Sequence, residues 1–214
     1  MKTFRTKNHG RWVALLGVVS FVAGCMPHAI GRAQSASTLG KGKHEAAVDL
    51  RYQALINGFL GGSFRYGVAD NVDVGVRALA AFPAYGASSL DLSTKFQFTP
   101  KDSWAVVAFE PSVNFSLPGV GSQMTVLLGA KAGKHEFVFT PHVALHPWEW
   151  TGRHNEIREY LGVGASLGFY ARCSDNFRIM PEVGVRLLPF NRRNGAYDGG
   201  PVRAEFGLAF LFGN

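Results

Sequence analysis

Three polar side chains near the middle of the chain have the types needed for acyl transfer. Glu110, Ser112 and His142 could supply an acid, a nucleophile and a base. This chemistry requires the base to lie within hydrogen-bond distance of the nucleophile. The alternation around them places Glu110 and Ser112 in one strand and His142 two strands further on, and no local motif links them. We therefore expect a hydrogen-bonded interior histidine, and we assign no catalytic residue.

Residues 146–159 form the stretch with the densest chemistry, which we expect to be a loop. Its histidines and glutamates are possible metal ligands: His146, Glu149, His154, Glu156 and Glu159. Their spacing fits no compact metal site. The sequence also has no glycine-rich phosphate loop and no paired-cysteine site, so we expect no metal and no cofactor. Trp148 and Trp150 are better suited to the level of lipid headgroups.

A second polar stretch near the end of the chain contains Arg192, Arg193 and Tyr197. Their side chains could donate charge-assisted hydrogen bonds to the phosphates of lipopolysaccharide. A solvated charged loop explains the same residues equally well, so both interpretations stay open.

The chain carries a formal charge of +7, with 22 basic and 15 acidic residues. Four of the basic residues precede the apolar run 12–23: Lys2, Arg5, Lys7 and Arg11. A basic start and an apolar run too short to cross a bilayer as a helix are typical of a secretory signal. Without residues 1–24 the chain keeps 18 basic and 15 acidic residues, a charge of +3. This charge is weak support for nucleic-acid binding, and we expect no nucleic-acid partner.

The rest of the chain alternates between apolar and polar residues in ten short segments. Successive side chains of a strand point to opposite faces, so this period of two predicts ten strands in an all-β barrel or sandwich. The segments are 43–54, 60–68, 72–80, 90–98, 107–115, 123–132, 136–145, 160–172, 178–187 and 201–212. Pro111 in the fifth segment cannot donate a ladder hydrogen bond and predicts a bulge.

The polar face of these strands carries charges of both signs. The basic residues are Lys43, Arg51, Arg65, Arg77, Lys95, Lys131, Arg172, Arg178, Arg186 and Arg203. The acidic residues are Glu45, Asp49, Asp73, Asp91, Glu110, Glu136, Glu182 and Glu205. Interspersed charges predict ion pairs between strands that fill a narrow lumen, whereas a ring of one sign would indicate ion selectivity. A closed polar lumen is our prediction, and a small leaky pore is the alternative.

The connections between strands favour a membrane barrel over a soluble one. The links at Asp70, Lys101, Lys134 and Asp175 are short, and those around Ile56, Pro83, Pro118, Trp148 and Asn194 are longer on the whole. Outer-membrane barrels show the same asymmetry, with short periplasmic turns and longer outer loops. An even number of strands also returns both ends of the barrel to the periplasmic side. Alternation alone would fit a soluble barrel too.

The last strand, Pro201 to Phe212, resembles the C-terminal insertion signal of bacterial outer-membrane barrels. Glu205, Gly207, Phe210 and Phe212 match its pattern of a polar residue, a glycine and two spaced aromatic residues, although two residues follow Phe212. The resemblance implies an antiparallel up-and-down transmembrane barrel over residues 43–214. It also implies that the barrel-assembly machinery and the lipids of the outer membrane are partners.

The end of the apolar run, Val22-Ala23-Gly24-Cys25, resembles a bacterial lipobox. The resemblance implies a lipoprotein: cleavage before Cys25 by the lipoprotein-processing machinery, and acylation of Cys25 by a fatty acid such as palmitate. Met26, rather than aspartate, fits the outer membrane of a Gram-negative bacterium. The alternative is an ordinary signal cleaved after Ala33. Residues 25–42, rich in small residues and without periodicity, then predict a flexible tether.

Three functions remain open from the sequence. The first is a non-enzymatic barrel lipoprotein with a structural, interaction or minor pore role. The second is an outer-membrane hydrolase acting on lipid or peptide through His142 or the Trp148 loop. The third is a lipid-anchored periplasmic barrel that binds an apolar ligand. Cys173, with no partner once Cys25 is acylated, is expected to be a small turn residue.

Overall fold

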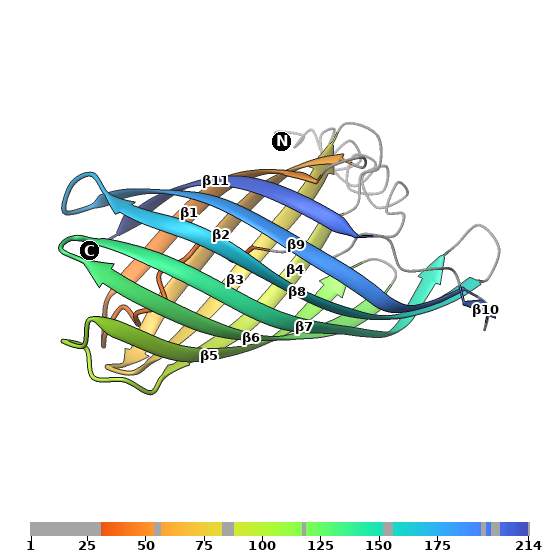
Figure 1. Cartoon of the computed structure of the whole chain (residues 1–214), viewed down its shortest axis with the longest axis horizontal. Coiled ribbons are helices and arrows are strands. Elements are labelled where there is room, and N and C mark those ends of the chain that lie inside the picture. The colour runs from red at the N-terminus through yellow and green to blue at the C-terminus, as the bar shows by residue number, and fades with distance from the viewer. Residues whose placement is uncertain are drawn as a thin grey trace, which may run out of the picture.

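The computed structural model describes residues 31–53, 57–82, 88–116, 119–151, 156–193, 196–197 and 202–213, and only the backbone of some strand residues next to the gaps. The fold is a closed antiparallel barrel of ten strands, as the sequence predicts (Figure 1). The strands are β1 (His44–Gln53), β2 (Asn57–Ala69), β3 (Val72–Phe82), β4 (Ser88–Gln97), β5 (Ala105–Ser116), β6 (Gly119–Ala132), β7 (His135–Thr151), β8 (Glu156–Arg172), β9 (Phe177–Arg193) and β11 (Arg203–Gly213).

The barrel closes because the last strand pairs with the first. Strand β11 lies between β9 and β1, and the register places Phe210 opposite Val48. Every other barrel strand pairs with its neighbours in sequence. The eleventh element, β10 (Ala196–Tyr197), adds two residues beside the end of β9. None of the described residues forms a helix long and apolar enough to cross a membrane.

The two ends of the barrel differ, and we name them by their connections. At the turn end, short links join β2 to β3, β4 to β5, β6 to β7 and β8 to β9. At the opposite end, which we call the loop end, Gln53 of β1 faces Asn57 of β2. Strand β1 starts and β11 finishes at the turn end, where Glu45 faces Gly213. Both ends of the barrel sequence therefore lie on the same side, as predicted.

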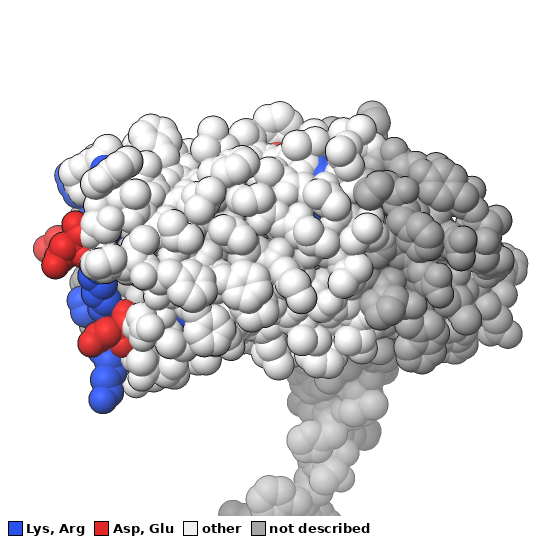
Figure 2. Space-filling view, turned by 60° about the horizontal axis from the view of Figure 1, so that its bottom comes forward, with Lys and Arg blue, Asp and Glu red and all other residues white. Residues whose placement is uncertain are grey.

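Apolar side chains cover the outer wall. Leu50, Leu60 and Leu92 are each about half exposed (51%, 50% and 47%), and they belong to three different strands. On the face that Figure 2 shows, the described part of the wall carries almost no charge, and the charged residues gather at the turn end. The predicted assignment of faces is confirmed, because the charged residues of the opposite face are mostly buried in the lumen.

Three local predictions are wrong. The ladder from β5 to β6 continues through Pro111, which pairs with Met124 without a shift of register, so no bulge forms there. Most of the predicted loop at 146–159 belongs instead to two strands: β7 continues to Thr151 past a bulge between His146 and Glu149, and β8 begins at Glu156. Likewise, Arg192 and Arg193 close strand β9, and Tyr197 lies in β10.

The largest correction concerns residues 31–40, which we call the lumen segment. The sequence predicted part of a flexible tether here, but the segment lies inside the barrel, and Gly31 to Ala36 are all buried. The small side chains allow the chain to fit between the strands. The predicted signal peptide and the acylation of Cys25 lie outside the described residues and stay predictions.

Candidate functional site: the lumen and its N-terminal segment

The lumen segment runs from the middle of the barrel to the turn end. Its first residue, Gly31, donates its N–H to Glu205 Oε1 of β11 at 3.1 Å. Just after its other end, Gly42 donates to the carbonyl of Gly67, next to the β2–β3 turn, at 2.8 Å. The chain then enters β1 directly. The segment therefore occupies the turn-end half of the lumen.

A cluster of ion pairs holds the walls together around Gly31. The Arg51 guanidinium donates to Asp49 beside it on β1, to Glu182 of β9 at 3.1 Å and to Glu205 of β11 at 2.7 Å. Arg77 of β3 donates to the same Asp49 oxygen at 2.7 Å. We call these five side chains the Arg51 cluster. Such pairing is required because buried charges are stable only when they have partners.

The Arg51 cluster also binds the backbone of the lumen segment. The N–H groups of Arg32 and Ala33 both donate to the Glu182 carboxylate at 3.2 Å. Two successive N–H groups pointing at one carboxylate form a small anion-binding nest. Ala33 adopts a φ of +50° there, which costs an L-residue about 1–2 kcal/mol. Arg77 donates to the carbonyl of Gly31 at 2.9 Å. The start of the segment is thus bound through its main chain.

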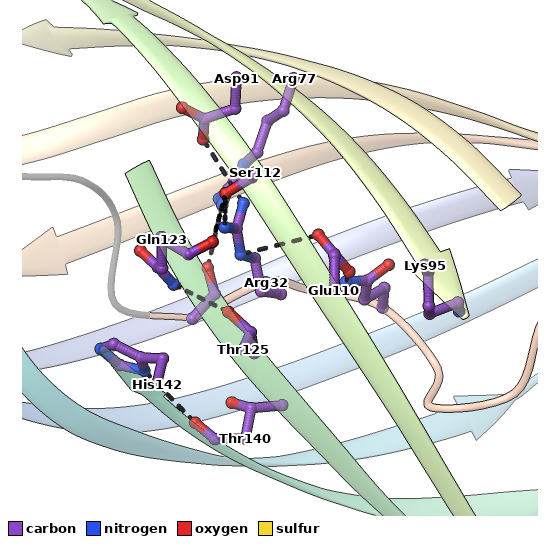
Figure 3. A network of polar contacts seen from close by, with 12 residues as sticks. Arg32, Arg77, Asp91, Lys95, Glu110, Ser112, Gln123, Thr125, Thr140 and His142 are labelled. Carbon is purple, nitrogen blue, oxygen red and sulfur yellow. Dashed lines mark hydrogen bonds and ion pairs between the residues drawn. The ribbon is translucent and has the colours of Figure 1, made fainter. Parts of the chain in front are cut away.

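The side chain of Arg32 lies at the centre of a second network (Figure 3). It is 3.6 Å from Asp91 of β4, 3.8 Å from Glu110 of β5, and it donates to the Ser112 hydroxyl. Gln34 donates to the other Glu110 oxygen. Arg32 is thus the cation that the β4 and β5 carboxylates face.

The turn-end part of the segment is bound mainly by Lys95 and Asp73. Lys95 of β4 donates to the carbonyls of Ser35 at 3.0 Å and Ser37 at 2.6 Å, and lies 3.4 Å from Asp73 of β3. The N–H of Leu39 donates to Asp73 at 3.1 Å, while the N–H of Thr38 donates to Gln97 Oε1 at 2.8 Å. Because buried backbone groups need partners, these contacts make an irregular chain stable inside the barrel.

One part of the inner wall is apolar, which the alternation alone did not predict. Ala33 and Ala36 of the lumen segment pack in a buried cluster with wall residues from six strands: Ala47, Val106, Ala108, Leu127, Val138, Met180, Ala209 and Leu211. The segment therefore covers this apolar surface as well as the charges. The lumen segment and the inner wall therefore match each other in both polarity and shape.

The three candidate catalytic residues are not brought together. Ser112 accepts from Arg32 and its hydroxyl lies 3.4 Å from the carbonyl of Gln123, while Glu110 faces Gln34 and Arg32. His142 uses both ring nitrogens elsewhere: Nδ1 faces the carbonyl of Thr140 at 3.3 Å, and Nε2 accepts from Arg186 at 3.2 Å. A histidine engaged in this way does not activate Ser112. The expected hydrogen-bonded interior histidine is what the lumen contains (Figure 3).

The residues of the predicted insertion signal lie at both faces of β11. Glu205 is buried in the Arg51 cluster, and Gly207 pairs with Arg51 in the ladder. Phe210 and Phe212 lie on the outer face at the turn end, where their rings approach that of Phe177 at centroid distances of 6.5 and 5.3 Å. Whether the assembly machinery recognises these residues stays a prediction.

The other candidate residues contribute little to a site. Cys173 is an exposed free thiol in the β8–β9 turn, and the described part of the chain contains no cluster of three potential metal ligands. The side chains of the possible ligands from His146 to Glu159, of Trp148 and Trp150, and of Arg192, Arg193 and Tyr197 lie outside the described residues.

Sequence reasoning missed the lumen segment because it has no periodicity. One signal was present: Arg32 and Gln34 are the only charged and amide side chains between Gly31 and Gly40, among otherwise small, hydroxyl or apolar residues. Polar side chains capable of several hydrogen bonds, set among small residues, are suited to a narrow polar channel.

No protein-family model and no curated protein matches this chain. Among solved structures it is similar to the COG4313 outer membrane channel from Pseudomonas putida F1, with 9% identity, coverage of 89% of this chain and 100% of that one, and a TM-score of 0.56. The chain has the fold of an outer-membrane β-barrel.

Two further structures are less similar. A transmembrane β-barrel designed de novo has 12% identity over 86% of this chain and 100% of its own, with a TM-score of 0.39. The N-terminal barrel domain of OprF from Pseudomonas aeruginosa has 15% identity over 81% and 99%, with a TM-score of 0.35. At these identities the likeness concerns the fold alone.

Proposed function

We propose that this protein is an outer-membrane barrel lipoprotein, anchored through Cys25, whose lumen is closed by residues 31–40 and which has a structural or gated pore role without enzymatic activity. The observation that carries the closed lumen is the binding of Gly31, Arg32 and Ala33 by Glu182 and Glu205. A barrel of eight strands has an interior just filled by side chains, so ten strands leave room for one additional chain.

The outer wall supports a membrane location. Exposed large apolar side chains occur on every barrel strand, and the charges of the described wall gather at the turn end (Figure 2). Soluble monomers rarely expose apolar patches of more than a few hundred Å². An apolar wall with charged residues at its turn end is the pattern expected of a barrel in a bilayer, with the turn end on the periplasmic side.

The placement of Arg32 favours cleavage upstream of residue 31. Cleavage after Ala33 would remove the cation that faces Asp91 and Glu110 and the N–H groups that bind Glu182. The carboxylates would then keep fewer partners in a buried site. Cleavage before Cys25 leaves the whole lumen segment in the mature chain. Loss of labelled fatty acid in Cys25→Ala would test the acylation, and label retained there would refute it.

The contents of the lumen also argue against the two alternative functions, a barrel that binds an apolar ligand and a hydrolase. Binding of an apolar ligand inside the barrel finds little support, because Ala33 and Ala36 already cover the apolar part of the inner wall. A hydrolase finds none in Ser112 and His142, whose hydrogen bonds go to other groups.

Conductance across planar bilayers tests the closed lumen. The mature protein should be silent at most times, and a variant lacking residues 31–40 should conduct continuously. Arg32→Ala with Gln34→Ala keeps the chain length, and should produce frequent transient openings. Lys41→Ala, whose side chain lies outside the lumen, is the control. Heat-modifiable migration in gels establishes that each variant is folded.

A folded deletion variant that stays silent would show that side chains alone close the barrel, and the pore role would be refuted. Continuous conductance by the mature protein would show that the lumen segment does not close it.

A further inference from the structure

The turn end of the lumen contains a cavity beside the lumen segment. Its volume is about 300 Å³. Ser35, Ser37, Thr38 and Leu39 of the segment form one side, and residues from the start of β1, the β6–β7 turn and the facing ends of β8 and β9 form the other. A molecule in this cavity would therefore contact the segment and the barrel wall together.

The cavity is strongly basic. Five of its lining residues carry positive charges: Lys43, Lys131, Lys134, Arg172 and Arg178. Only one lining residue, Glu136, is acidic, and Ser35 of the segment donates to it. Positive charges that share one cavity repel each other, and an anion placed among them lowers their energy.

The barrel neutralises these charges only in part. Arg172 pairs with the exposed Asp175 at 2.9 Å, and Arg178 lies 3.8 Å from Glu45. Lys131 donates to the carbonyl of Lys101. Within the part of the chain that the structure describes, Lys43 and Lys134 form no ion pair. Two ammonium groups thus remain for a ligand.

A second, independent feature points to a ligand with acceptor oxygens. The Ser37 hydroxyl is buried in the lining and has no hydrogen-bond partner among the described residues. Nearly all buried polar groups in proteins have a partner. The hydroxyl can donate a hydrogen bond to an oxyanion.

We propose that this cavity binds a phosphate group, carried by a phosphate monoester in the periplasm or by the headgroup of an anionic phospholipid. A phosphate monoester presents three terminal oxygens and about −1.5 to −2 charges at pH 7, while the diester of a phospholipid headgroup presents two terminal oxygens and about one charge. In both, oxygens that share negative charge accept charge-assisted hydrogen bonds from several separate cations. The volume corresponds to about ten water molecules, at roughly 30 Å³ each, so a glycerol-sized group fits beside the phosphate.

Binding would favour the closed barrel. A ligand that contacts Ser37 of the lumen segment and Lys134 of the wall binds the closed form better than a form with the segment displaced. It stabilises the closed form by a free energy that grows with the ratio of its concentration to its dissociation constant. This consequence rests on the proposed function, whereas the binding itself does not.

Calorimetric titration of the detergent-solubilised mature protein tests the proposal. Glycerol 1-phosphate should bind with a measurable heat, and glycerol should not. Lys43→Gln with Lys134→Gln should weaken binding at least tenfold, and Ser37→Ala by a few fold. The matched control is Lys101→Gln, which removes one positive charge at the same end of the barrel from a side chain that pairs with Asp70. It should keep the affinity of the unchanged protein.

Equal affinities in the double variant and the control, or no heat with glycerol 1-phosphate, would overturn the proposal. The source of the phosphate follows from reconstitution. If bilayers containing phosphatidylglycerol, but not pure phosphatidylcholine bilayers, block the titration, the ligand is a lipid headgroup; if both leave it unchanged, the ligand is a soluble ester. Because no conductance is measured, a negative result here leaves the closed-lumen test unaffected, and the reverse also holds.

Discussion

The outer wall and the lumen of this barrel are built by different rules. On the wall, any apolar side chain of suitable size is compatible with contact to lipid. Leu50 and Leu60, which face each other on β1 and β2, therefore need no particular partner. In the lumen, each charged group depends on particular others: Arg51 binds Asp49, Glu182 and Glu205 from three strands. The wall therefore tolerates apolar exchange, whereas the lumen tolerates little.

This difference follows from the two environments. The membrane offers no hydrogen bonds, so the wall must avoid polar groups but need not arrange them. The lumen is narrow and most of its charged side chains are buried, so these groups need partners of the correct sign and geometry. Opposite substitutions should therefore destabilise the barrel on its two faces. On the outer wall the damaging change is the addition of a charge, and in the lumen it is the removal of a charge.

The largest effect is expected inside, at Arg51, which is almost fully buried. Replacement by methionine keeps an unbranched apolar side chain and removes the charge that Glu182 and Glu205 share. Breaking a buried ion pair by removing one partner costs roughly 3–5 kcal/mol. Arg51→Met should lower the free energy of unfolding by about that amount, measured by urea unfolding in lipid vesicles.

Lys101→Met is the matched control for this loss. Lys101 pairs with Asp70 at 3.3 Å on the exposed turn end, and exposed pairs contribute about 0–1 kcal/mol. Similar losses for both variants would mean that water enters the lumen freely, and the contrast between the two faces would disappear.

A smaller effect is expected on the wall, at Val126 in the middle of β6. An arginine at the membrane midplane costs about 2–4 kcal/mol, and about 0–1 kcal/mol near the interface. Val126→Arg should therefore destabilise the barrel in vesicles by much more than Ala132→Arg, on the same face of the same strand at the turn end. Equal unfolding free energies for the two variants would place the membrane elsewhere.

The same contrast explains which parts of the structure could be predicted from the sequence. The wall alternates within each strand, so the existence of all ten strands and their faces followed from local pattern. The ends of β7 did not: the bulge between His146 and Glu149 interrupts the period of two, so the strand seemed to stop at Leu145. Alternation is informative only while the ladder is regular.

The lumen segment was not predictable in this way. Gly31 binds Glu205, which lies 174 residues further along the chain, and Arg32 binds Ser112, which lies 80 residues further. Neither contact leaves a local pattern. The charges on the inner face indicated ion pairs between strands, and those pairs exist, but nothing in the alternation showed that Glu182 and Glu205 also bind a main chain. Only the fold brings these groups together.

The smallest effect on stability is expected at the rim of the wall, where Phe212 lies beside Phe177. Because Phe212 is 49% exposed, its loss removes part of an aromatic contact, which typically contributes about 0.5–1.5 kcal/mol. Phe212→Ala should thus unfold from vesicles only slightly more easily than the unchanged protein. In cells we expect a larger loss of inserted barrel, since the resemblance of residues 205–212 to an insertion signal implies recognition by the assembly machinery.

Phe98→Ala separates packing from recognition, because Phe98 is an aromatic residue at the same end, 69% exposed and outside the last strand. If truncation of an aromatic ring at the membrane surface were the whole cause, both variants would insert equally well in cells. A loss confined to Phe212→Ala in cells, with near-normal refolding into vesicles, would assign the role to recognition. Normal insertion of Phe212→Ala in both settings would show that β11 closes the barrel through its ladder and Glu205 alone. The rim of the wall would then tolerate apolar exchange as well as the centre of the wall does.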